Sequence, residues 1–296
     1  MIDLIQNTID GMMIGSSYGL LALGFTLIFG LMRRLNLSYG PSIMIGGYLG
    51  TVFFLQYAAG PLVVAGAVVA GAVIAGIYVE MLCFAPMKAG AGIASMVSSF
   101  AIWMQLEQAA ILVLPRHTYP FPALATGAPL QLGPFLIRVD HLIMLLCGLG
   151  LAAAVQLILY RTRFGLGLRA IIGNSIAAHL VGINVRMAVL FAFAGASAIG
   201  GIAGFLVLAT DQQITPMFGM WATLKGLIAM MIGGLGSIPG AVLGGLLLGV
   251  AEAHSQWYFG PQIRDLVTYF ILFAFLVMRP GGLLGSAPEA AMTQKA

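Results

Sequence analysis

The residues of this sequence that could do chemistry are few, and the most distinctive are carboxylates inside apolar runs. Glu107 lies in the run IWMQLEQAA, and Glu252 and Glu80 each lie near the end of another apolar run. An ionisable group in a membrane is costly, so it marks either a partner or a function. For Glu107 and Glu252 three interpretations stay open: a polar contact between helices, a place at the membrane interface, or a part in a translocation path.

The sequence contains none of the compact motifs of common enzymes. It has no GxxxxGK[ST] phosphate loop, so we expect this chain neither to bind nor to hydrolyse ATP. It also has no HExxH, paired CxxC or GxSxG motif, and GLGLRA lacks the strand and turn of a dinucleotide site. The histidines, which show no metal-ligand spacing, are His117, His141, His179 and His254. We therefore expect no catalytic residue, metal or cofactor in this chain.

The composition predicts an all-α integral membrane protein. Of 296 residues, 60% are hydrophobic and only 7% are charged, whereas soluble domains carry about 25% charged residues. The mean hydropathy is +1.03. A net charge of +4 spread over such a chain forms no basic face, so nucleic acid is not an expected partner. Cys83 and Cys147 lie in apolar runs, which favours packing over a disulfide.

The elements that must position these residues are apolar runs long enough to cross a bilayer, which takes about 20 residues. They predict one transmembrane domain over residues 1–296, a polytopic bundle of about eight or nine helices, some of them short or broken. The runs are 8–30, 40–58, 61–85, 93–114, 139–160, 187–209, 222–236, 238–256 and 263–279. The run 222–236 is short, and it is separated from the run 238–256 only by GLGSIPG. These two runs together therefore also fit a broken helix or a re-entrant hairpin.

The distribution of basic residues predicts the orientation. With nine crossings and the N-terminus outside, nine Lys and Arg residues fall inside and four outside, as the positive-inside rule requires. The inside group is Arg33, Arg34, Lys88, Arg161, Arg163, Arg169, Arg186, Arg279 and Lys295; the outside group is Arg116, Arg138, Lys225 and Arg264. We therefore expect a cytoplasmic C-terminus.

Two loops stand out in this arrangement. The outer loop 115–138 is dense in proline (Pro115, Pro120, Pro122, Pro129 and Pro134), which predicts an irregular cap without helix or sheet. This cap either closes the protein or contacts an extracytoplasmic partner. The inner loop, residues 161–186, reads RTRFGLGLRAIIGNSIAAHLVGINVR.

The 161–186 segment predicts a helix, a break, a short helix and a stop. Apolar residues recur every four positions, as on one helix face: Leu168, Ile172, Ile176 and Leu180. Gly173 interrupts this pattern, and Asn174 with Ser175 predicts the N-cap of a short helix at about 175–181. Gly182 followed by Asn184 predicts its end. The short helix either lies on lipid headgroups or docks into a groove on a cytoplasmic partner.

Four long stretches, in order, resemble the permease subunits of branched-chain amino acid ABC importers, the LivH-type family. They are GLLALGFTLIFGLMRRLNLSYG, RTRFGLGLRA…AAHLVGINV, GLIAMMIGGLGSIPGAVLGGLLLGVAE and RDLVTYFILFAFLVMRPGGLLG. The resemblance covers almost the whole chain. It implies a bacterial inner-membrane importer for branched-chain or other hydrophobic amino acids. A permease for urea or short amides is the nearer alternative, and an ion-coupled transporter or channel is the more distant one.

The resemblance also implies partners and a coupling segment. The partners are a second homologous permease in a heterodimer, two cytoplasmic ATPase subunits that bind ATP and Mg²⁺, an extracytoplasmic solute-binding protein and the bilayer. The 161–186 segment would seat in an ATPase subunit, and the residues assigned to this contact are Arg163, Gly165, Arg169, Ile176, Ala177, Ala178, Leu180 and Gly182. Ile176 occupies the position where the family motif has an acid, so this contact should depend on apolar packing.

Two further groups of residues complete the expected site. The family's early Asn-x-x-His-Gly pattern is altered here, and the candidate translocation-path residues are Asn36, Tyr39, Pro41, Glu107 and Glu252. The late glycines, Gly236, Gly240, Gly244 and Gly249, have GxxxG-like spacing that suits close helix packing. They pack either within this chain or against the second permease subunit.

Overall fold

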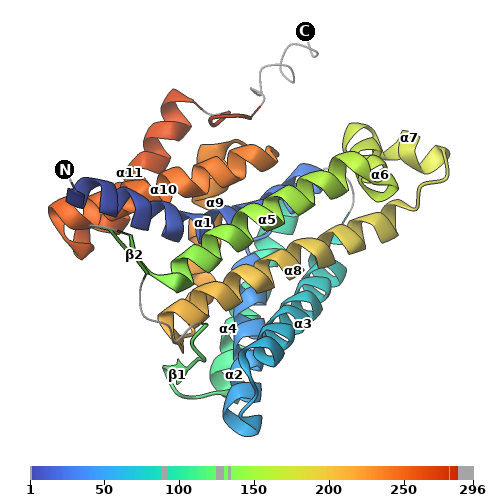
Figure 1. Ribbon diagram of the computed structural model, residues 1–296. Coiled ribbons are helices and arrows are strands. Elements are labelled where there is room, and N and C mark those ends of the chain that lie inside the picture. The colour runs from blue at the N-terminus through green and yellow to red at the C-terminus, as the bar shows by residue number, and fades with distance from the viewer. Residues whose placement is uncertain (1, 88–91, 125–129, 133–134, 280, 286–296) are drawn as a thin grey trace. The chain divides into compact units, whose positions relative to one another are not determined.

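The structure is a computed structural model that describes residues 2–87, 92–124, 130–132, 135–279 and 281–285 (Figure 1). Predicted features at Lys88, Pro129, Pro134 and Lys295 lie outside these ranges. The longer helices are α1 (Ile2–Met32), α2 (Tyr39–Tyr57), α3 (Pro61–Val79), α4 (Gly92–Val113), α5 (Val139–Arg161), α8 (Val185–Asp211), α9 (Phe218–Gly233), α10 (Ile238–Phe259) and α11 (Pro261–Met278). The predicted all-α class is confirmed, and each of the nine predicted runs coincides with one of these helices.

Seven helices in the described part of the chain are long and apolar enough to cross a membrane. They are α1, α3 with the π-helical turn η1 (Glu80–Phe84) that extends it, α4, α5, α8, α10 and α11. Of the other two, α9 has only 16 residues. The second of these two helices is α2, in which glycines, tyrosines and Ser42 lie among the apolar residues. The residues GLGS (234–237) between α9 and α10 form a sharp turn, in which Gly234 and Gly236 adopt positive φ angles.

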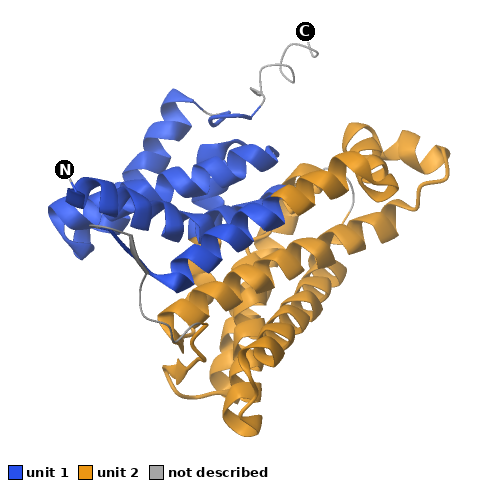
Figure 2. Cartoon of the chain, viewed as in Figure 1, with its two compact units in different colours: residues 1–26, 127–152, 225–296 blue, residues 27–126, 153–224 orange. Residues whose placement is uncertain are grey.

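The chain forms two compact units, each assembled from separate stretches of sequence (Figure 2). Unit 1 contains residues 1–26, 127–152 and 225–296, and unit 2 contains residues 27–126 and 153–224. In unit 2, helices α2, α3 and α8 pack against one another. The 161–186 segment belongs to unit 2, and the late glycines belong to unit 1.

Small residues allow the helices of each unit to approach closely, as is typical of membrane helices. In unit 2, a Cβ added at Gly46 would lie 2.3 Å from the carbonyl oxygen of Val68, so α2 and α3 meet at backbone distance. In unit 1, a Cβ at Gly245 would lie 2.2 Å from the amide nitrogen of Gly19, so α10 meets α1 in the same way.

Most of the late glycines pack closely against other backbone of the same chain. A Cβ at Gly244 would lie 2.2 Å from the carbonyl oxygen of Ala229, and one at Gly249 would lie 2.3 Å from that of Gly11. Gly240 meets the backbone of Gly233 in the same close way. Only Gly236 in this group has no atom near its missing Cβ. The structure thus favours packing within the chain for Gly240, Gly244 and Gly249, because neighbouring backbone already covers the face offered to a second permease.

The proline-rich loop contains short strands, so the prediction of a cap without sheet was wrong. Strand β1 (Tyr119–Pro120) pairs antiparallel with β4 (Gln213–Ile214) in unit 2, and Tyr119 is opposite Ile214. Strand β2 (Leu130–Leu132) pairs with β3 (Phe135–Ile137) in unit 1. Proline is excluded only from central strands, and each of these sheets has two strands, both of them edges.

Candidate functional site

The 161–186 segment has the helix–break–helix structure that its sequence predicts. Helix α6 (Arg163–Gly173) begins at Thr162, whose Oγ1 accepts a hydrogen bond of 3.1 Å from the amide of Gly165. Asn174 then caps α7 (Ser175–Leu180): its Oδ1 accepts bonds of 3.0 Å from the amides of Ile176 and Ala177. These side chains satisfy helix amides that would otherwise lack a partner.

The end of α7 is also as predicted. Gly182 has a φ of +88°, a conformation that costs other residues free energy. Asn184 then caps α8, accepting a 3.1 Å bond from the amide of Met187. The connection between α7 and α8 is therefore short and defined at both ends.

Gly165 explains why α6 folds back against the end of α5. A Cβ at this position would lie 2.3 Å from the carbonyl oxygens of both Ile158 and Leu159. No larger residue fits without moving backbone, so the turn between α5 and α6 depends on this glycine. Gly165, which the sequence analysis assigned to the coupling contact, therefore has a structural role at this turn.

One side of the segment is anchored in unit 2. Leu168, Ile171 and Ala178 are buried in an apolar cluster with Leu31 of α1 and Ala192 of α8. The predicted four-residue stripe does not form one buried face, because the break at Asn174 changes the helix direction. Of the stripe, Leu168 is buried whereas Ile172, Ile176 and Leu180 are exposed.

The other side of α7 carries an exposed apolar tip, formed by Ile176, Leu180 and Val181. Their side chains are 74%, 81% and 77% exposed. Exposed arginines lie nearby in the sequence: Arg161 ends α5, Arg163 begins α6, and Arg169 stacks over the ring of Tyr160 at 5.1 Å. An apolar tip among cations suits a partner groove or a headgroup layer.

The early candidate path residues lie in a tightly bonded junction of unit 2. Asn36 Oδ1 accepts a 3.0 Å bond from the amide of Ser38, and the Tyr39 hydroxyl donates a 3.0 Å bond to the carbonyl of Ala196 on α8. Ser38 donates from its hydroxyl to the carbonyl of Ser99 on α4. Asn36, Tyr39 and Pro41 are all buried. In this conformation their polar groups hold the start of α2 against α4 and α8.

The two candidate carboxylates have different surroundings. Glu107 is half-buried and accepts a 2.8 Å bond from the indole nitrogen of Trp103, one turn earlier in α4. Glu252 is 3% exposed. Its Oε1 accepts bonds from Lys225 (2.5 Å) and Thr268 (2.6 Å), and its Oε2 accepts a 2.8 Å bond from the Tyr18 hydroxyl. Glu252 therefore connects α10 to α1, α9 and α11 within unit 1.

Lys225 lies inside a helix and not in a loop. The charge count assigns it to the outer side, and the structure shows that its side chain, 6% exposed, belongs to α9. Besides Glu252 it donates a 3.0 Å bond to Asp265 Oδ1 on α11. Arg264 Nε is 3.8 Å from Glu252 Oε2. The apolar residues around this lysine, in TLKGLIAMM, were the sequence signal that it is buried. Its acidic partner could not be identified in this way because it lies on another helix.

The buried network, the seven apolar spans and the capped 161–186 segment define a polytopic α-helical membrane protein with one exposed helical tip. Residues 7–276 match the family described as branched-chain amino acid transport system / permease component. The chain belongs to this family, in agreement with the resemblance seen in its sequence.

Similar proteins cover nearly the same length. The chain is 29% identical over 293 residues to the high-affinity branched-chain amino acid transport system permease protein BraD of Pseudomonas aeruginosa, covering 95% of each chain. It is 29% identical over 294 residues to LivH of Escherichia coli K12, again covering 95% of each. A probable LivH of Methanocaldococcus jannaschii is 26% identical over 288 residues, covering 90% of this chain and 88% of its own.

A solved structure shows the same fold. PsaBC from Streptococcus pneumoniae in complex with Fab matches with a TM-score of 0.53 at 11% sequence identity. The match covers 97% of this chain and 94% of the other.

Proposed function

We propose that this chain is the membrane-spanning permease subunit of an ATP-driven importer for branched-chain or other hydrophobic amino acids. Its family and the names of its full-length relatives support this substrate class. Partner ATPase subunits bind ATP and Mg²⁺, since the sequence has no phosphate loop. A second, homologous permease completes a heterodimer, and an extracytoplasmic solute-binding protein delivers the substrate.

The observation that carries this proposal is the exposed apolar tip of α7. Ile176 and Leu180 are largely exposed, although α7 is capped by Asn174 and anchored through the buried Ala178. A short helix that presents apolar side chains is a common way to fill a groove on another protein. We assign this contact to the ATPase. With the N-terminus outside and the C-terminus in the cytoplasm, as the distribution of basic residues predicts, the tip lies on the ATPase side.

The anchoring of α7 gives the tip a mechanical role. Ala178 is 3% exposed in the cluster shared with α8, and Gly182 and Asn184 connect α7 to α8 over a few residues. Helix α8 in turn packs along α2 and α3. A displacement of the tip by the ATPase would therefore move α8, and through it the junction at Asn36 and Tyr39 that we assign to the translocation path.

Co-purification with an ATPase tests the proposal. The tagged chain is extracted from its native membrane in mild detergent, and bound subunits are identified by mass spectrometry. We expect an ATPase and a second permease with this fold. Recovery of the intact chain without any ATPase contradicts the importer function. The solutes retained by the cognate binding protein then distinguish amino acids from urea or short amides.

A further inference from the structure

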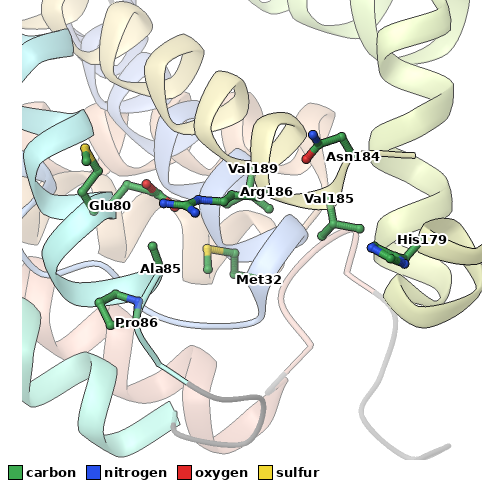
Figure 3. A pocket seen from close by; sticks show the side chains of 10 residues that line it. Met32, Glu80, Ala85, Pro86, His179, Asn184, Val185, Arg186 and Val189 are labelled. Atoms are coloured by element: carbon green, nitrogen blue, oxygen red, sulfur yellow. The ribbon is translucent and has the colours of Figure 1, made fainter. Parts of the chain in front are cut away.

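A cavity of about 570 Å³ lies beside the 161–186 segment, within unit 2. One wall is the π-helical turn at the end of α3, and the other is the junction of α7 and α8 (Figure 3). Its polar lining residues are Glu80, His179, Asn184 and Arg186, and the apolar ones include Met32, Val185 and Val189. The volume falls in the range of about 300–1,000 Å³ that is typical of small-molecule sites.

Glu80 is the most unusual group in this cavity. The residue is 3% exposed, and within the described part of the chain its carboxylate accepts no hydrogen bond and forms no ion pair. A buried charge without a direct partner is unfavourable, and a bound cation would remove that cost. Glu80 also begins the π-helical turn, a local distortion that is frequent at functional sites.

Arg186 supplies the complementary charge. It lies in the first turn of α8, and its side chain extends toward Glu80 (Figure 3). Arg186 attracts the Glu80 carboxylate electrostatically, although no hydrogen bond or ion pair joins the two side chains among the described residues. A molecule with an ammonium and an anionic group fits such a separated pair better than a simple ion, because each end meets an opposite charge. Met32, Val185 and Val189 offer an apolar surface beside it.

We propose that this cavity is a binding site for a small zwitterion with an apolar portion. The ammonium would bind to Glu80, the anionic group to Arg186, and the apolar portion to Met32, Val185 and Val189. A free apolar amino acid has this chemistry, and so does the headgroup of phosphatidylethanolamine. A ligand here would connect α3 to the α7–α8 junction and restrain the movement that drives transport. This consequence rests on the proposed function; an amino acid accumulating in the cytoplasm would then slow its own import.

The first experiment measures import against internal amino acid. Right-side-out membrane vesicles containing the whole transporter are loaded with ATP, with or without millimolar L-leucine, and the initial rate of labelled leucine uptake is recorded with the binding protein outside. We expect internal leucine to lower the wild-type rate severalfold. Glu80→Gln should import at the same rate with and without internal leucine. Asp140→Asn, outside the cavity, should be inhibited like the wild type.

The second experiment measures binding itself. The complete complex in nanodiscs is titrated with L-leucine, with 4-methylpentanoate, which lacks the amine, and with isopentylamine, which lacks the carboxylate. Glu80→Gln and Arg186→Gln should each weaken leucine binding at least about tenfold, the effect of losing one charge-assisted hydrogen bond. Both truncated ligands should bind similarly weakly. The exposed Arg186 serves as a second variant because its replacement leaves the buried packing unchanged.

Nanodiscs with and without phosphatidylethanolamine identify the source of the zwitterion. If the headgroup is the ligand, adding this lipid changes the ATPase rate of the wild type but not of Glu80→Gln, and leucine has no effect. If neither leucine nor the lipid acts through Glu80 and Arg186, the proposed site is wrong, even when import is normal. A chain that neither binds an ATPase nor imports amino acids overturns the proposed function instead.

Discussion

The Nζ atom of Lys225 lies 2.5 Å from Oε1 of Glu252, and both side chains are almost completely buried. Because Lys225 is on α9 and Glu252 is on α10, this pair holds together two helices joined by a tight glycine turn. Tyr18 and Thr268 complete the coordination of the carboxylate from α1 and α11. Unit 1 is thus organised around a neutralised charge, which is how a membrane protein can retain ionisable residues within its spans.

The first prediction concerns the stability of unit 1. Glu252→Gln leaves the buried ammonium of Lys225 with only Asp265, so we expect a loss of about 3–5 kcal/mol, the usual cost of breaking a buried pair. Thermal unfolding of the purified chain in detergent measures this. Glu107→Gln is the matched control, since within the described ranges the Glu107 carboxylate is hydrogen-bonded only to Trp103, on its own helix. Equal unfolding temperatures for the two variants would contradict the role of Glu252.

The second prediction concerns the exposed tip of α7. Replacing Ile176 and Leu180 with serine removes apolar area that the ATPase would bury, a loss of about 1.5–3 kcal/mol for each large side chain. Recovery of the ATPase with the tagged chain should fall at least about tenfold. Leu62→Ser, at an 89% exposed position at the start of α3, should not change it. If the double variant retains the ATPase and instead weakens binding to anionic vesicles, α7 is an interfacial helix.

The third prediction concerns the connection between α7 and α8. Gly182→Ala places a Cβ at a φ of +88°, with a strain of about 1–2 kcal/mol, and should disturb this link. ATP hydrolysis should persist while uptake falls, so more ATP is consumed per amino acid imported. Gly173→Ala is the control, because its missing Cβ faces open space and its φ is not positive. If Gly182→Ala hydrolyses as much ATP per imported amino acid as the wild type, the connection tolerates this strain and the prediction is wrong.

The sequence predicted the helices of this protein better than the contacts between residues far apart in the chain. The nine apolar runs became helices, and the caps at Asn174 and Asn184 formed where expected, because both depend on residues close in the chain. The burial of Lys225 was not foreseen because its partner, Glu252, is 27 positions away. Strands β2 and β3 pair locally and were missed because the proline density was read as excluding a sheet. Strand β1 was missed because its partner, β4, lies far away in the sequence. The cavity beside Glu80 was not foreseen for the same reason: its two walls come from α3 and α8.

The fourth prediction concerns the late glycines. Gly249→Ala should destabilise the chain by about 1–3 kcal/mol, because the new Cβ would lie 2.3 Å from the carbonyl oxygen of Gly11 and α10 must move away from α1. The loss should appear in the isolated chain, without any second permease. Gly150→Ala, with no atom near its missing Cβ, is the control. If Gly249→Ala leaves the isolated chain as stable as the wild type but prevents permease pairing, the glycines form the interface between subunits.

The last prediction separates the ATP-driven importer from an ion-coupled transporter. In an ion-coupled mechanism Glu107 and Glu252 would carry the coupling ion, and removing both would abolish uptake together with its pH dependence. In the proposed importer, Glu107→Ala should retain ATP-driven uptake with an unchanged pH profile, because among the described residues the Glu107 carboxylate is hydrogen-bonded only to Trp103 on the same helix. Uptake in Glu252→Ala should fall only in proportion to the amount of folded protein, measured by size-exclusion chromatography. Folded but inactive protein in either variant, with the pH dependence lost, would favour the ion-coupled mechanism.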